Sequence, residues 1–326
     1  MPSRTRDTGV PGPRRVEAAP AGATGAAPAG LPIVVDGLTK TYGATAAVQD
    51  LSFTARPGRI TGFLGPNGAG KTTTLRILVG LARSTAGAAT FGGTAYADLP
   101  QPQRRVGCVL EPSFHPGRTG RNHLRVLAAT TGLGDDRVDP LLALVGLTEA
   151  ARRPAGGYSL GMRQRLALAG ALLGDPDHLI LDEPANGLDP EGIRWLRSFL
   201  RSFAAQGRTV LVSSHLLGEV QATVDDIVVI NGGRLLRQTS MAGLDMDHAA
   251  SRVRVSDPAA AHAALTALGL TVHLLRDDQG DLLRVQSGDL TQIGTALFRA
   301  GVPVLELARV HQDLEQQFFA MMEADR

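Results

Sequence analysis

Residues 65–72 read Gly-Pro-Asn-Gly-Ala-Gly-Lys-Thr, and this spacing suits chemistry on phosphate groups. The glycines let the backbone wrap closely, so that successive N–H groups can point at phosphate oxygens. Lys71 would reach the terminal phosphates as a point charge, and Thr72 would offer a hydroxyl to Mg²⁺. The segment predicts a site for a nucleoside triphosphate. The residues expected to line it are Gly65, Pro66, Asn67, Gly68, Ala69, Gly70, Lys71, Thr72 and Thr73.

Two acidic residues follow a second apolar segment, at 178–181. A buried strand that ends in Asp182 and Glu183 would place both carboxylates at the carboxyl edge of a parallel sheet, where ligands bind. In that position we expect Asp182 to hold Mg²⁺ through its water shell and Glu183 to polarise the attacking water. Together with Lys71, these acids favour ATP hydrolysis over a regulatory nucleotide binder without turnover.

The composition sets outer limits on function. The 326 residues are 43% hydrophobic and 20% charged, with a formal net charge of +2. That length allows two domains, and so small a charge gives no reason to expect nucleic acid as a partner. The longest apolar run, at 166–174, is about half of the ~18–20 residues that a membrane span needs. We therefore expect a chain that does not cross a bilayer by itself.

The elements that must position these residues follow from periodicity. Residues 1–30 are rich in Pro, Ala and Gly and predict a disordered tail, because they offer little surface to bury. From 31 to about 240, strands alternate with helices, which predicts an α/β domain with a largely parallel, doubly covered sheet. The expected strands are 33–35, 51–54, 59–64, 106–110, 179–181, 209–213 and a hairpin at 228–236. The expected helices are 72–81 and 191–205.

The order of elements changes in the last part of the chain. A linker is expected around 239–250, followed by a small accessory domain at 250–326. Its predicted order is βαββαβ, the split-βαβ pattern of an α+β fold. The expected strands are 253–255, 272–275, 282–285 and 304–307, and the expected helices are 258–268, 290–300 and a terminal one at 312–322. This part shows no catalytic constellation.

The segment Tyr158-Ser159-Leu160-Gly161-Met162-Arg163-Gln164-Arg165 opens a helix and resembles the signature segment of ABC-transporter ATPases. In that family, a Ser and a Gly at a helix N-terminus cap the γ-phosphate of the nucleotide on the opposite subunit. The family's common form is Leu-Ser-Gly-Gly-Gln, whereas this chain keeps only Ser159 and Gly161 of it. The Ser-Leu-Gly-Met form looks like the drug- and peptide-antibiotic exporter branch.

The resemblance implies a P-loop NTPase fold of ABC type, with a helical subdomain at about 111–175. It also implies roles for single residues: Tyr42 would stack on adenine, and His215 would contact the γ-phosphate. The segment 186–189 resembles the loop through which subunits meet. One position departs from the family, because Glu111 stands where relatives usually carry a Gln that meets Mg²⁺ or water. A carboxylate can still bind Mg²⁺, but it adds negative charge and lacks the amide donors.

The same resemblance implies partners. One glycine loop and one signature segment per chain predict a dimer that sandwiches two ATP molecules, as a homodimer or with a paralogue. A separate transmembrane permease would be needed, so the chain is expected at the cytoplasmic face of the membrane. Candidate contacts with that permease are Phe114, His115, Pro116 and Arg118. The alternative is a soluble ABC ATPase that acts on ribosomes or DNA.

Overall fold

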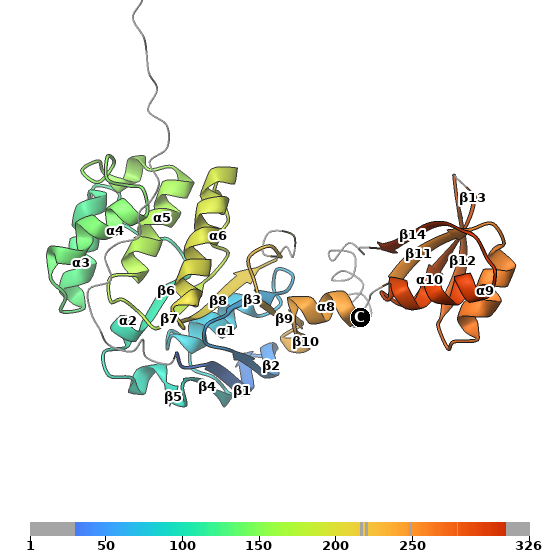
Figure 1. The fold of residues 1–326 in the computed structure, drawn as a ribbon. Helices are drawn as coiled ribbons and strands as arrows, with labels where there is room; N and C mark the ends of the chain where they lie inside the picture. Colours follow the sequence, from blue (N-terminus) through green and yellow to red (C-terminus); the bar gives the residue numbers. More distant parts are fainter. Residues whose placement is uncertain (1–29, 216–217, 219–220, 248–249, 279, 311–326) are drawn as a thin grey trace, which may run out of the picture.

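The computed structural model describes residues 30–215, 218, 221–247, 250–278 and 280–310 (Figure 1). The predicted tail at 1–29 and the predicted terminal helix at 312–322 lie outside the described residues. Within this part of the chain, no helix has both the length and the apolar composition that crossing a membrane requires.

A six-stranded sheet forms the centre of the nucleotide-binding part. Its strands pair in parallel, except for the antiparallel hairpin of the last two strands in sequence, which confirms the predicted hairpin. In spatial order the strands are β10 (Arg234–Ser240), β9 (Asp226–Asn231), β3 (Ile60–Leu64), β8 (Thr209–Ser214), β7 (His178–Leu181) and β6 (Val106–Val109).

Both faces of this sheet are buried, as the continuous apolar character of its strands predicts. In β7, Leu179 and Leu181 face one hydrophobic core, while Ile180 between them faces the other. The first core is completed by α5 (Leu160–Ala171) and α6 (Pro190–Ala205). The second includes α1 (Lys71–Leu78), which follows the glycine loop. The doubly covered sheet is therefore confirmed.

A second sheet was not foreseen as a separate layer. It is antiparallel and runs in the order β2 (Thr45–Ala55), β1 (Ile33–Tyr42), β4 (Ala86–Phe91) and β5 (Thr94–Ala95). The sequence predicted β1 and β2 but not β4, whose residues Ala-Gly-Ala-Ala-Thr-Phe are mostly small and half of them exposed. Pairing with β1, rather than local apolar periodicity, makes this segment a strand.

A group of helices lies between β6 and β7 in sequence. Its members are α3 (Gly120–Thr130), α4 (Val138–Leu144) and α5, after the short α2 (Pro102–Arg105). In Figure 1, α3, α4 and α5 form the green helical group beside the yellow α6. The side chain of Thr119 caps α3 by accepting a hydrogen bond from the Asn122 N–H at 3.2 Å. Such a hydroxyl satisfies an N–H that has no partner within the helix.

The C-terminal part has the predicted βαββαβ order and a hydrophobic core of its own. The elements are β11 (Ala250–Val255), α9 (Pro258–Thr266), β12 (Val272–Asp277), β13 (Gly280–Val285), α10 (Leu290–Arg299) and β14 (Val304–Val310). The strands form an antiparallel sheet in the order β12-β13-β11-β14. This order is the split-βαβ arrangement.

The expected linker at 239–250 is wrong for most of its length. Strand β10 continues to Ser240, and α8 (Met241–Asp247) follows it directly. The N–H of Met241 donates to the Asp225 carbonyl at 2.9 Å, and Leu244 is fully buried in the core of the nucleotide-binding part. Packing of α8 against the main core thus gives a regular structure to a segment with little hydrophobic periodicity of its own.

An ion-pair cluster fastens the start of β9 to the segment before β3. Asp226 is 3% exposed, and Arg59 Nε and Nη2 donate to its two oxygens at 2.6 and 2.7 Å. Arg56 Nη2 adds a hydrogen bond at 2.7 Å. Burial raises the pKa of Asp226, but the hydrogen bonds and charges of Arg59 and Arg56 together outweigh burial and lower that pKa below its usual range.

Replacing Asp226 by Asn is expected to lower the free energy of unfolding at neutral pH by about 1–3 kcal/mol. The loss is no larger because water around the two partly exposed arginines screens their attraction to Asp226. Because the folded pKa is depressed, the carboxylate stabilises the fold fully above about pH 4 and loses this effect as pH falls below that value. Urea unfolding of both proteins at pH 7 and pH 3 tests this. A difference between them that does not shrink at pH 3 would contradict the assignment.

Candidate active site

The glycine loop joins the carboxyl end of β3 to the first turn of α1, as the sequence predicted. Gly68 and Gly70 have φ values of 84° and 98°, a backbone region that favours glycine. A Cβ atom on Gly70 would lie 2.4 Å from the Ala47 carbonyl oxygen, and one on Gly65 would lie 2.5 Å from that of Ile230. The loop is therefore wedged between β2 and β9, and neither position has room for a side chain.

Lys71 begins α1 with its side chain folded into the loop and only 7% exposed. Its Nζ donates to the carbonyl oxygen of Gly65 at 2.6 Å and to that of Pro66 at 3.3 Å. The same Nζ lies 3.6 Å from Glu183 Oε1. A buried ammonium surrounded by loop carbonyls and one carboxylate is a positive charge held where phosphates would bind.

Thr72 and Asp182, predicted as magnesium residues, meet directly. Thr72 Oγ1 donates to Asp182 Oδ2 at 2.7 Å, and the Asp182 N–H donates to the Val109 carbonyl at 2.8 Å. Parallel pairing aligns the carboxyl ends of β3, β7 and β8, which brings the two side chains to one edge. A hydroxyl and a carboxylate are oxygen ligands of the type that Mg²⁺ prefers, so these residues fit that ion.

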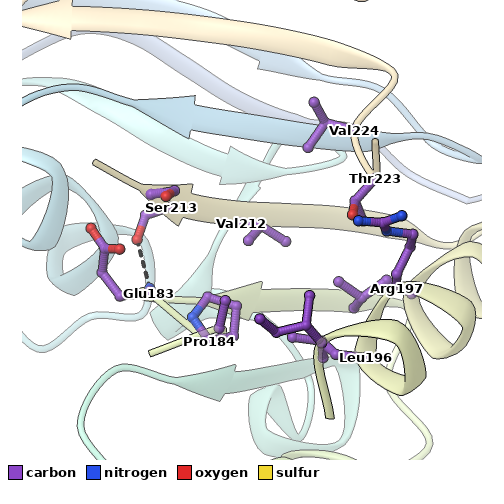
Figure 2. Close-up of a pocket in the computed structure, with 12 residues that line it drawn as sticks. Glu183, Pro184, Leu196, Arg197, Val212, Ser213, Thr223 and Val224 are labelled. Atoms are coloured by element: carbon purple, nitrogen blue, oxygen red, sulfur yellow. Dashed lines mark hydrogen bonds between the residues drawn. The ribbon is translucent and has the colours of Figure 1, made fainter. Parts of the chain in front are cut away.

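Ser213 is a site residue that sequence reasoning missed. Its hydroxyl donates a short hydrogen bond to Asp182 Oδ1 and accepts one from the Glu183 N–H at 2.9 Å. The second bond is the dashed line in Figure 2. Ser213 is fully buried near the end of the apolar strand β8, and a hydroxyl residue at the end of an apolar strand was the available signal in the sequence. One hydroxyl thus orients both acidic residues.

Glu183 has an unusual backbone for a non-glycine residue, with φ at 48°. Such a conformation costs energy and concentrates at functional sites. Its side chain lies between two residues predicted for the site: Lys71 faces Oε1, and His215 Nδ1 lies 3.0 Å from Oε2. The structure therefore brings Lys71, Asp182, Glu183 and His215 together at one sheet edge.

Tyr42 ends β1 with 51% of its surface exposed, and Lys40 Nζ lies 4.6 Å from the centre of its ring. Strand β2 pairs with β1 here and approaches Gly70 through the Ala47 carbonyl. An exposed ring on the hairpin beside the glycine loop is available to stack on a base. The adenine-stacking role of Tyr42 stays a prediction.

The signature segment lies at the start of α5. Ser159 caps this helix, and its Oγ accepts a hydrogen bond from the Met162 N–H at 3.2 Å. A Cβ on Gly161 would lie 3.3 Å from the Gly187 carbonyl, so the neighbour of this segment is the 186–189 loop. The exposed start of this helix is accessible to a second subunit. The roles of Ser159 and Gly161 toward that subunit's nucleotide stay predictions.

Glu111 follows β6, and 79% of its side-chain surface is exposed. Its Oε1 accepts a hydrogen bond from Arg76 Nη2 at 3.2 Å, one turn along α1 from Thr72. The structure thus joins Glu111 to Arg76 rather than to the Thr72–Asp182 pair. Its role as a magnesium ligand stays a prediction.

A direct role of Glu111 at the metal predicts that Glu111→Gln raises the Mg²⁺ concentration needed for half-maximal ATPase activity by about tenfold. ATPase rates at graded Mg²⁺ concentrations measure this. Arg76→Met is the matched control, because it removes the ion pair and keeps the carboxylate. Rates and Mg²⁺ dependence identical to wild type would remove Glu111 from the mechanism.

Taken together, a glycine loop before a helix, a buried lysine, a Thr–Asp pair and a strained glutamate define a P-loop nucleoside triphosphatase. The ABC transporter family model matches residues 48–186, and a family model for a domain of unknown function matches residues 249–315.

The chain is 36% identical to the bacitracin transport ATP-binding protein BcrA of Bacillus licheniformis, over 87% of this chain and 95% of that protein. It is also 36% identical to the lantibiotic transport ATP-binding protein SrtF of Streptococcus pyogenes, over 64% of this chain and 91% of that protein. A solved ATP-binding subunit of an ABC transporter matches with a TM-score of 0.60 and 30% identity, over 65% of this chain and 91% of that one. The chain belongs to the ATP-binding proteins of the ABC transporter family, and it is an ATPase.

Proposed function

We propose that this chain powers a separate membrane permease that exports an antibiotic-like compound, or another small-molecule or peptide cargo. The observation that carries the proposal is the match along nearly the full length of a bacitracin transport ATP-binding protein. The signature form Ser159-Leu160-Gly161-Met162 supports the same branch. On this proposal the chain works at the cytoplasmic face of the membrane.

The proposed reaction uses ATP with Mg²⁺. Thr72 and Asp182 would hold the ion, which would neutralise charge on the phosphates during hydrolysis. Lys71 would bind the terminal phosphates, and the backbone N–H groups of the glycine loop would hold them in place. Glu183, oriented by Ser213 through its backbone, would accept a proton from the attacking water.

The proposed working unit is a dimer, either of two copies of this chain or of this chain with a paralogue. Ser159 caps α5 with its own hydroxyl, and the start of that helix carries the positive end of the helix dipole. A phosphate from the facing subunit would meet both. ATP would hold the two subunits together, and hydrolysis would let them part.

The proposal can be tested by asking whether this chain associates with a membrane protein. We expect that affinity purification of the full chain from its native cells, in mild detergent with ATP, recovers a polytopic membrane protein. Glu183→Gln should increase the recovery, because it should lengthen the ATP-bound state. Recovery of ribosomes or DNA without a membrane protein would favour the soluble alternative and overturn the proposal.

A further inference from the structure

Arg165 on α5 also contacts α6 and the end of α4. Its Cζ lies 5.3 Å from the centre of the Trp195 ring on α6. Its Nη1 donates to the carbonyl of Val145, the C-cap of α4, at 3.4 Å. A cation at a helix C-terminus and over an indole face is favoured at both places.

Arg165 forms no ion pair with an acidic side chain in the part of the chain that the structure describes. In the same helical region, Arg105 and Arg121 pair with Asp177 and Asp139. Arg165 instead has a ring face and a helix-end carbonyl as its neighbours. A guanidinium can lie flat on a ring while its N–H groups donate in its own plane, whereas an ammonium group has no planar face.

The helices that Arg165 connects carry the two loops that the dimer proposal needs. Ser159 caps α5, and Asp189 caps α6 by accepting a hydrogen bond from the Gly192 N–H at 2.8 Å. A Cβ on Gly192 would lie 3.4 Å from Arg165 Nη2, so the guanidinium packs directly on the first turn of α6. Movement of one helix start relative to the other would break this packing.

The seam between α5 and α6 also reaches the catalytic acids. A cavity of about 10 Å³ lies in it, lined in part by Arg165, Trp195, Leu181 and Pro184. Leu181 and Pro184 flank Asp182 and Glu183 in the sequence. Arg165 and Trp195 thus line the same cavity as the residues that flank the two acids.

We propose that Arg165 is a positioning residue, which, stacked on Trp195, holds the signature residues Ser159 and Gly161 in register with the 186–189 loop. The inference rests on the proposed dimer, because both segments would act on the facing subunit. Loss of the stack would leave ATP binding to the glycine loop of a single subunit intact and would weaken the joining of two subunits.

The test uses Glu183→Gln as the parent and measures two quantities. Sedimentation gives the ATP-driven dimerisation, and a fluorescent ATP analogue at low protein concentration gives the affinity of the monomer. We expect Arg165→Lys and Arg165→Met to weaken dimerisation by about tenfold, the scale of a desolvated cation–π contact. Monomer affinity should stay within about twofold. Emission of Trp195, the only tryptophan, should shift in both variants.

Matched variants separate positioning from a general loss of structure. Arg194→Met makes the same change at an exposed arginine beside Trp195 and should dimerise like the parent. Trp195→Phe keeps a ring and should retain most of the dimerisation, whereas Trp195→Leu should lose it as Arg165→Met does. Unchanged dimerisation of Arg165→Lys and Arg165→Met would overturn the inference, and so would an equal loss of monomer affinity. If the parent itself stays monomeric with ATP, the homodimer on which this test rests fails first.

Discussion

Replacing Glu183 by Gln is expected to lower ATP turnover by about 10²- to 10⁴-fold, the usual contribution of a positioned general base. The amide keeps the size of the side chain and loses the carboxylate that we propose accepts the proton of water. ATP binding should persist, because the proposed phosphate contacts come from the glycine loop. It should be as tight or tighter, since the variant removes a carboxylate 3.6 Å from Lys71 Nζ. Steady-state phosphate release and equilibrium ATP binding measure the two quantities.

The matched control for this change is Glu191→Gln, which removes an exposed carboxylate from the first turn of α6. It should turn over ATP at the wild-type rate. If Glu183→Gln also turns over ATP at that rate, the assigned role in polarising water is wrong. If it loses ATP binding in proportion to turnover, Glu183 supports the loop through Lys71 instead.

Two inactive variants are expected to recover activity when they are mixed. Lys71→Ala removes the charge that we propose binds the phosphates. Ser159→Asp keeps a good helix cap but adds a negative charge where the facing nucleotide's phosphate would lie. In a mixed dimer, one site combines the intact loop of one chain with the intact signature segment of the other. Random mixing should restore at most about a quarter of wild-type activity, because half of the dimers carry one intact site.

The separate variants provide the baseline for that experiment, and their sum must fall well below the activity of the mixture. A mixture of Lys71→Ala with the double variant Lys71→Ala/Ser159→Asp is the control, because none of its dimers has an intact loop. Recovery in the first mixture alone supports a site shared between subunits. Failure to recover activity at any mixing ratio would contradict a site shared between two copies of this chain, and the homodimer with it.

The chemistry of the site was predictable to a large extent because its signals are local. The glycine loop is a continuous segment whose residue spacing is enough to predict phosphate binding. The acids at 182 and 183 directly follow a short buried strand. Parallel pairing then brings the ends of such strands to one edge, so the meeting of Thr72 with Asp182 follows from the fold class. The βαββαβ order of the C-terminal part was equally readable from periodicity.

What remained hidden depends on which segments pair across long stretches of chain. Strand β4 exists because it lies against β1, and α8 is ordered by packing of Leu244 into the main core. The bonds of Ser213 and the ion pair of Glu111 join residues thirty or more positions apart. The sequence by itself determined the class of chemistry and the order of the elements, because both are encoded in short segments. Only the tertiary structure decided which side chains meet, because a hydrogen bond or ion pair requires two groups within a few ångströms.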